Sequence, residues 1–87
     1  MKIKKEYTLL YDDQISIVQT MPDGTQREVA PISDTAAMAW EGIAKGVDRK
    51  RLVDAIVNEF SGADAATVER DLDGLIAQLR ELGYIED

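Results

Sequence analysis

The sequence predicts an α+β domain in which a three-stranded antiparallel β-meander precedes three helices. The first third of the chain contains short runs rich in aromatic and aliphatic residues, separated by turn signals, which is typical of strands. The rest contains three stretches with apolar residues at helical spacing, each preceded by a capping residue. With 87 residues, of which 45% are hydrophobic, the chain can fold around one modest core, so we expect a single domain over residues 1–87.

The strands are expected at residues 6–11, 15–21 and about 26–30. Asp-Asp-Gln at 12–14 interrupts the first run and predicts a turn. Pro-Asp-Gly-Thr at 22–25 predicts a second turn, because proline fixes φ and glycine permits a positive φ. Pro31 should end the third strand, because it has no N–H to donate within a sheet.

The three helices are expected to begin at polar caps, because the side-chain oxygens of Ser and Asp accept hydrogen bonds from the free N–H groups of a first turn. The caps are Ser33 or Asp34, then Asp48, then Asp64. The expected stops are Gly46, Ser61–Gly62 and Gly83. The third helix should carry a broad apolar stripe of Val68, Leu72, Leu75, Ile76, Leu79 and Leu82. Tyr84 and Ile85 should then fold back as a short extended tail against the core.

The composition argues against several classes of function. A net charge of -7 repels the phosphates of nucleic acids and the surface of anionic membranes. No stretch is apolar enough for a signal peptide or a transmembrane helix, so we expect a cytoplasmic protein. The absence of His and Cys removes the commonest general base, metal ligand and thiol nucleophile. We therefore predict a protein that is not an enzyme and that uses no metal or cofactor.

A three-stranded sheet has two edge strands, and one of them suggests a binding surface. If the third strand is an edge, an extended peptide can add to it as a further strand, held by main-chain hydrogen bonds. That strand would present Gln26, Arg27, Glu28, Val29 and Ala30. The run is polar, and charged edge strands also serve to prevent aggregation. The residues alone leave both interpretations open, a docking edge and a protected edge.

The apolar stripe of the third helix also has two interpretations. Leu72, Leu75 and Leu79 lie near its centre, and Asp71 lies near one margin. A leucine stripe at helical spacing is the ordinary mark of a helix packed on a core. This stripe is wide, and a margin left uncovered would form the wall of a groove for a partner.

Three segments of the chain resemble the PqqD family, named for the biosynthesis of pyrroloquinoline quinone. ISDTAAMAWEGI at 32–43 resembles the family's polar cap, small residues and large apolar residue in its first helix. GVD and LVDAI within 46–56 resemble its glycine turn and short second helix. VERDLDGLIAQL and LGYI within 68–85 resemble its Val-x-x-Asp-Val/Leu pattern and its Leu-x-x-x-Gly-Leu-Ile ending. The resemblance runs from about Tyr7 to Glu86.

The resemblance implies a winged-helix-like fold and a role as a precursor-peptide recognition element. The leader segment of a ribosomally made peptide would add to the third strand and pack against the third helix. A separate modifying enzyme, often a radical S-adenosylmethionine enzyme, would then act on the captured peptide. The residues implied in peptide binding are Gln26, Arg27, Glu28, Val29 and Ala30 on the strand, with Asp71, Leu72, Leu75, Gln78 and Leu79 on the helix.

Two other functions remain as alternatives. The first is a winged-helix DNA-binding regulator, suggested by the basic cluster Arg49, Lys50 and Arg51. The net charge and the acidic third helix argue against DNA, and we interpret the cluster as solvated charge available to a partner enzyme. The second alternative is a small structural domain that forms a homodimer when the third strand pairs with its copy.

Overall fold

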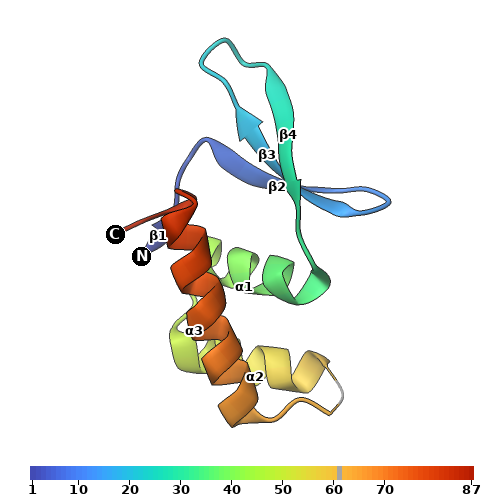
Figure 1. Cartoon of the computed structure of the whole chain (residues 1–87), viewed down its shortest axis with the longest axis vertical. Coiled ribbons are helices and arrows are strands. Elements are labelled where there is room, and N and C mark those ends of the chain that lie inside the picture. Colours follow the sequence, from blue (N-terminus) through green and yellow to red (C-terminus); the bar gives the residue numbers. More distant parts are fainter. Residues whose placement is uncertain (61) are drawn as a thin grey trace.

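The structure, a computed structural model, describes residues 1–60 and 62–87 (Figure 1). The strands are β1 (Lys2–Ile3), β2 (Tyr7–Tyr11), β3 (Ile15–Thr20), β4 (Gln26–Pro31) and β5 (Ile85–Glu86). The helices are α1 (Asp34–Lys45), α2 (Arg49–Glu59) and α3 (Ala65–Glu81). Ser61, predicted in the turn after the second helix, lies outside the described residues. Of the helices that the structure describes, none is long and apolar enough to cross a membrane.

The predicted meander is confirmed as an antiparallel sheet with the order β2-β3-β4. This sheet lies at one end of the molecule, and the helices lie at the other (Figure 1). The turn between β3 and β4 contains Gly24 at a φ of 89°, which explains the glycine at this position. Asp23 stabilises the same turn by accepting hydrogen bonds from the N–H and the hydroxyl of Thr25. As predicted, β4 ends at Pro31.

A second sheet, of two short strands, joins the two ends of the chain. β1 pairs antiparallel with β5, so that Lys2 lies opposite Glu86 and Ile3 lies opposite Ile85. The sequence did not predict β1, because a run of two residues has too little periodicity to be recognised. The extended tail after the third helix is confirmed, since Tyr84 and Ile85 are both buried.

The three predicted helices are confirmed together with their caps. Ser33, Asp48 and Asp64 each accept a hydrogen bond from the backbone N–H three residues later, at 3.2, 2.9 and 2.9 Å. Gly46 ends α1 in the left-handed conformation, with a φ of 77°. These local signals were readable in the sequence because each acts within a few residues of the helix end.

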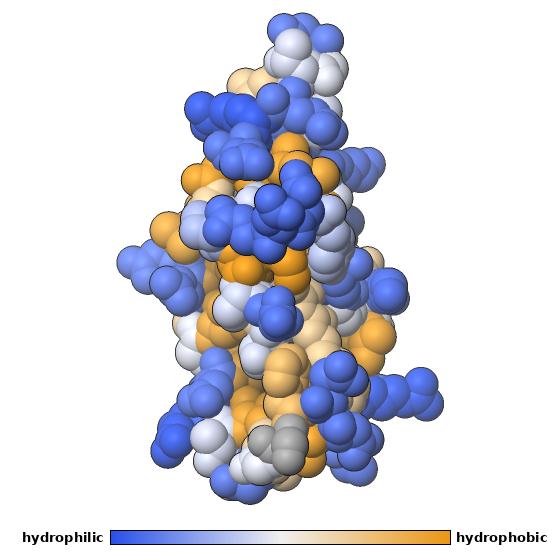
Figure 2. All heavy atoms as spheres, turned by 90° about the vertical axis from the view of Figure 1, so that its right-hand side faces the viewer, coloured by the Kyte–Doolittle hydropathy of each residue, from blue (hydrophilic) through white to orange (hydrophobic). Residues whose placement is uncertain are grey.

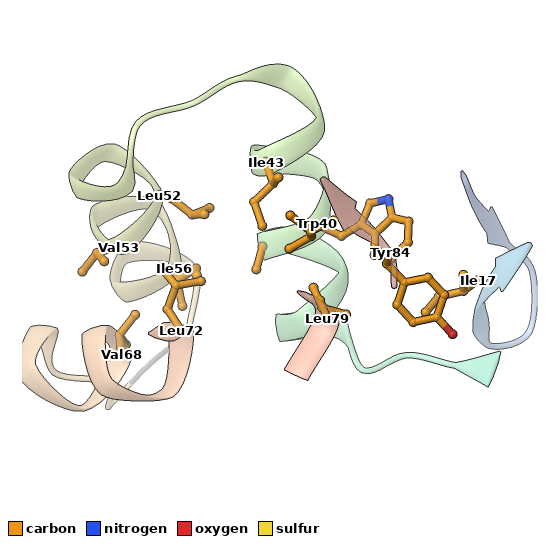
Figure 3. Close-up of a cluster of buried hydrophobic side chains, with 12 residues drawn as sticks. Ile17, Trp40, Ile43, Leu52, Val53, Ile56, Val68, Leu72, Leu79 and Tyr84 are labelled. Atoms are coloured by element: carbon orange, nitrogen blue, oxygen red, sulfur yellow. The ribbon is translucent and has the colours of Figure 1, made fainter. Parts of the chain in front are cut away.

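The core lies mainly among the three helices, with Trp40 of α1 among its residues, and Ile17 of β3 joins it at the end nearest the sheet (Figure 3). The ring of Trp40 is fully enclosed and lies 5.6 Å, centroid to centroid, from the ring of Tyr84. Tyr84 also meets Tyr7 edge to face at 4.8 Å, so that these aromatic contacts attach β2 to the end of the chain. Helices α1 and α2 approach closely at Gly42, where a Cβ atom would lie 2.7 Å from Cδ1 of Leu52.

Candidate functional site

β4 forms one edge of the three-stranded sheet. The order β2-β3-β4 gives it one neighbouring strand, and no strand among the described residues pairs with its outer side. The side chains of Gln26, Arg27, Glu28 and Val29 are exposed, and that of Ala30 is partly buried. The five strand residues of the predicted site therefore lie in succession along an open edge.

The backbone groups of β4 alternate in direction, and one hydrogen bond establishes which of them face outward. The N–H of Met21 donates to the carbonyl of Thr25 at 2.7 Å, so the backbone of Thr25 faces β3. In an antiparallel ladder, successive residues face toward and away from the neighbouring strand in turn. Arg27 therefore faces β3, whereas the N–H and C=O groups of Gln26 and Glu28 point to the open edge. These two residues are the ones to which an added strand would bond.

A β-bulge interrupts this edge at Val29. Ala30 pairs with Ile17, whereas Glu28 pairs with the next residue of β3, so Val29 is an extra residue without a cross-strand partner. A bulge of this kind bends the strand and increases its twist. Beyond it, Pro31 has no N–H to offer to an added strand. The regular part of the edge therefore ends at Glu28, which the sequence did not indicate.

An apolar groove of about 370 Å³ separates the end of β4 from α3. Its lining includes Ala30, Pro31 and Ile32 on the strand side and Leu75, Gln78 and Leu79 on the helix side. The other lining residues are Ile17, Ser33, Ala36, Leu82 and Tyr84. The open edge and an apolar hollow are thus adjacent, and an extended ligand on β4 would place side chains in the hollow.

The hollow continues along α3 into a second one of about 200 Å³, between α3 and the start of α1. The two share Ser33, Ala36 and Leu75. The second hollow is also lined by Thr35, Ala39, Ile56, Val68, Asp71 and Leu72. Together they form one continuous depression, which we call the α3 groove.

The five helix residues of the predicted site all line the α3 groove, but their accessibility differs. Leu72 and Leu79 are 3% and 4% exposed, so their side chains belong to the core. Leu75 is partly buried, whereas Asp71 and Gln78 are exposed. Leu72 and Leu79 therefore fit the interpretation of the stripe as a core face, whereas Leu75 is the one accessible leucine of the three.

The site offers main-chain hydrogen bonds beside an apolar surface, which are the two features that bind an extended peptide. Tyr84 lines the groove, and burial raises the pKa of its phenol, with the neighbouring Tyr7 raising it further. Among residues 1–60 and 62–87, no three acidic side chains lie together as a metal ion would require. The geometry is that of a binding surface.

Comparison with known families agrees with this geometry. Residues 17–85 match the family described as coenzyme PQQ synthesis protein D (PqqD). The chain belongs to the PqqD family. The matched segment begins in β3 and ends in β5, so it includes β4 and every residue that lines the α3 groove. Among curated proteins, no relative matches the chain.

One solved structure with a similar fold is TbiB1 in complex with the TbiA(beta) leader peptide. This PqqD-family chain and TbiB1 are 26% identical and superpose with a TM-score of 0.68. The superposition covers 99% of this chain and 100% of TbiB1. The likeness confirms the predicted α+β arrangement, in which a three-stranded antiparallel sheet precedes three helices.

The sequence pattern gave a wrong position for Leu82 and did not indicate several residues that line the α3 groove in this PqqD-family protein. Leu82 was predicted within the stripe of the third helix, but it is 59% exposed and lies at the end of the groove. The reason is that Leu82 is the C-cap of α3 and the chain turns at Gly83, with a φ of 89°. The missed lining residues that follow the third strand are Pro31, Ile32, Ser33 and Ala36. Their position directly after the third strand was the one available signal.

The basic cluster at the start of α2 is not a free cationic patch. Arg49 bonds to both carboxylate oxygens of Asp73 on α3 and lies 3.6 Å from the carboxylate of Glu69. Arg51 lies 3.7 Å from the carboxylate of its own helix cap, Asp48. Two of the three cations are therefore paired within the protein. All three side chains are exposed, which agrees with the interpretation of the cluster as solvated charge, and the two ion pairs reduce the positive charge that is free to meet DNA.

Proposed function

We propose that this PqqD-family protein captures the leader segment of a ribosomally synthesised precursor peptide and presents it to a separate modifying enzyme. One observation carries the proposal: the open edge of β4 lies beside the apolar α3 groove, in a fold similar to that of TbiB1 with its leader peptide. The protein acts as a non-catalytic binding module and needs no cofactor of its own.

The leader adds to β4 as a fourth strand of the sheet. Gln26 and Glu28 supply the outward N–H and C=O groups, and main-chain bonds of this kind give affinity with little dependence on sequence. Alternate side chains of an added strand face the same side. Those directed toward α3 enter the groove around Leu75, and they supply the specificity.

The modifying enzyme acts on the part of the precursor that extends beyond the groove. The family resemblance favours a radical S-adenosylmethionine enzyme in this role. Its iron–sulfur cluster would belong to that enzyme, because this chain contains neither Cys nor His to ligate one. We place the encounter in the cytoplasm, where the precursor is synthesised.

The open edge also favours a second candidate, a homodimer in which β4 pairs with its copy. Such a dimer would cover the outward groups of Gln26 and Glu28 and would therefore compete with the leader. Sedimentation velocity with and without peptide distinguishes the two, because leader binding would dissociate a β4-paired dimer.

The test of leader capture is a backbone NMR titration with synthetic leader peptides taken from precursor genes near the gene for this chain. We expect shifts confined to residues 26–30 and 71–82. Amide exchange adds a sharper criterion: the N–H groups of Gln26 and Glu28 should exchange rapidly in the free protein and slowly in the complex. The N–H of Arg27, which faces β3, should be protected in both.

A leader peptide of scrambled sequence is the control and should leave the spectrum unchanged. Shifts without new protection at Gln26 and Glu28 would rule out strand addition. A protein that responds to no leader but binds duplex DNA or only itself would overturn the proposal.

A further inference from the structure

A second apolar surface lies on the side of α1 that faces away from the α3 groove. Two shallow hollows there, of about 310 and 440 Å³, share the side chains of Tyr11 and Met38. Ile15 and Phe60 line the first hollow, and Val47 lines the second. We call this continuous surface the Tyr11 face.

Helix geometry separates the Tyr11 face from the α3 groove. Ala36 and Ala39 of α1 line the groove, whereas Met38, Glu41 and Lys45 line the Tyr11 face. At 100° per residue, Met38 lies about 200° from Ala36 around the helix. A protein bound to the Tyr11 face would therefore leave the groove open.

Apolar side chains of the Tyr11 face are open to solvent. Tyr11 is 59% exposed and Val47 is 40% exposed, whereas Met38 and Phe60 are partly buried. The view onto the side of the turn between β2 and β3 shows hydrophobic side chains in patches between charged ones (Figure 2). Contiguous apolar patches with a polar rim are typical of protein–protein contacts.

The charges around this face are mostly acidic, and Lys45 is the one cation among the described residues that line its hollows. Asp34 and Glu59 line the first hollow, and Glu41 lines the second together with Lys45. Within residues 1–60 and 62–87, the ion pairs use none of these three carboxylates. Asp12–Asp13 adds two further carboxylates in the turn that follows β2. A second copy of this chain would bring like charges together here, whereas a basic partner would be attracted.

We propose that the Tyr11 face is a second docking surface, which binds an apolar ridge flanked by Lys or Arg on the modifying enzyme. The proposal rests on the proposed function, because it takes that enzyme as the partner protein. Tyr11 and Met38 form the apolar centre of the contact, and the carboxylates around them pair with cations of the enzyme. Because the two surfaces are separate, one molecule holds the leader and the enzyme at the same time.

The test is direct binding of the full-length modifying enzyme encoded beside the gene for this chain. The double variant Glu41→Lys/Glu59→Lys should bind the enzyme about tenfold more weakly or worse, and Tyr11→Ala about threefold more weakly. Both variants should keep leader affinity within about twofold, because neither touches the groove. The matched control is Asp54→Lys/Glu81→Lys, which changes the net charge equally at exposed positions outside both surfaces.

The control variant separates the effect of charge at the Tyr11 face from the effect of overall net charge on enzyme binding. Three outcomes would overturn the proposal. In the first, the wild-type protein does not bind the enzyme. In the second, Glu41→Lys/Glu59→Lys binds it normally. In the third, Asp54→Lys/Glu81→Lys loses as much enzyme affinity as Glu41→Lys/Glu59→Lys. Circular dichroism and thermal unfolding of each variant confirm that the fold is retained.

A fourth variant distinguishes this proposal from leader capture. Glu28→Pro should lose the leader and keep the enzyme. If no leader binds the wild-type protein while Glu41→Lys/Glu59→Lys still loses the enzyme, the Tyr11 face stands and leader capture fails. Loss of both partners in Glu28→Pro would place the enzyme on β4 and count against the Tyr11 face.

Discussion

Arg49 on α2 holds Asp73 on α3 through both oxygens of the carboxylate. Its Nη2 atom lies 3.0 Å from Oδ1 and 2.9 Å from Oδ2, and its Nε atom lies 3.1 Å from Oδ1. The same guanidinium lies 3.6 Å from a carboxylate oxygen of Glu69, one turn earlier on α3. The start of α2 is thereby attached to the middle of the helix that forms one wall of the α3 groove.

The first prediction concerns this ion pair. Arg49→Ala should lower the free energy of unfolding by about 0.5–1 kcal/mol, because both partners are partly exposed and solvent screens the charges. Arg49→Lys should recover little of the lost stability, since an ammonium group cannot form the bidentate contact with the carboxylate of Asp73. Urea unfolding of the single variants and of Arg49→Ala/Asp73→Ala gives the coupling free energy. A coupling of zero would mean that the pair contributes no stability.

The second prediction concerns the open edge of β4. Glu28→Pro removes the outward N–H of Glu28 and should weaken leader binding at least about tenfold, since a main-chain hydrogen bond is lost and the ring obstructs the added strand. Glu28→Ala keeps the N–H and should bind the leader within about threefold of the wild type. Calorimetric titration measures both. Equal affinities for the two variants would show that the leader does not bond to this residue.

The third prediction concerns Leu75, the accessible leucine of the α3 groove. Leu75→Ala should cost about 1–2 kcal/mol of stability, less than a fully buried leucine, and should weaken leader binding about tenfold. Val57→Ala is the matched control, because Val57 is also partly buried against the core but does not line the groove. It should lower the urea midpoint and leave leader affinity unchanged. A similar loss of affinity in both variants would indicate that the effect arises from stability.

The fourth prediction compares two helical glycines whose replacement should act in opposite directions. Gly42→Ala should destabilise the protein by about 1 kcal/mol, because the new Cβ atom would overlap Leu52 in the contact between α1 and α2. Gly74→Ala should stabilise it by about 0.5–1 kcal/mol, because alanine favours a helix and the site is open. Thermal unfolding of the two variants tests the sign. Stabilisation by Gly42→Ala would show that Leu52 moves aside without cost.

The fifth prediction concerns acid sensitivity at the start of α3. The backbone N–H of Thr67 and then its hydroxyl lower the pKa of Asp64, the cap residue. A carboxylate whose pKa is lowered by folding contributes stability that is present above its unfolded pKa and is lost as the pH falls below about 4. Asp64→Asn retains a capping oxygen but should reduce this loss. Urea midpoints of the wild type and of Asp64→Asn at pH 7 and pH 3 test this. If both proteins lose the same stability between the two pH values, the acid sensitivity arises from other groups.

Most of the fold was predictable because its signals are local. Ser33, Asp48 and Asp64 cap helices by contacts three residues away, and Gly24 marks its turn by backbone conformation alone. The β1–β5 sheet was not predictable, since the partners Ile3 and Ile85 are far apart in the sequence. Strands of two residues are recognised only from the tertiary structure that pairs them.

In the candidate site too, the features set by local sequence were predictable and those set by tertiary contacts were not. That residues 26–30 form a strand followed from their pattern, but the bulge at Val29 depends on the register with β3, which single-strand periodicity does not report. The stripe of α3 was recognised, but the division between buried Leu72 and accessible Leu75 depends on how α1 and α2 cover it. The role of Gln26, Glu28 and the groove residues in leader binding stays a prediction.

The pairing of Lys2 with Glu86 has a consequence for engineering this protein. The two ends emerge beside each other (Figure 1), so a short flexible linker would close the backbone into a ring without stretching it. The ring would be reopened in the exposed connection at Val47, between α1 and α2. Such a circular permutant would move both termini away from the aromatic contacts of Tyr84 while leaving β4 uncut, and a tethered precursor would then reach the groove from a different direction.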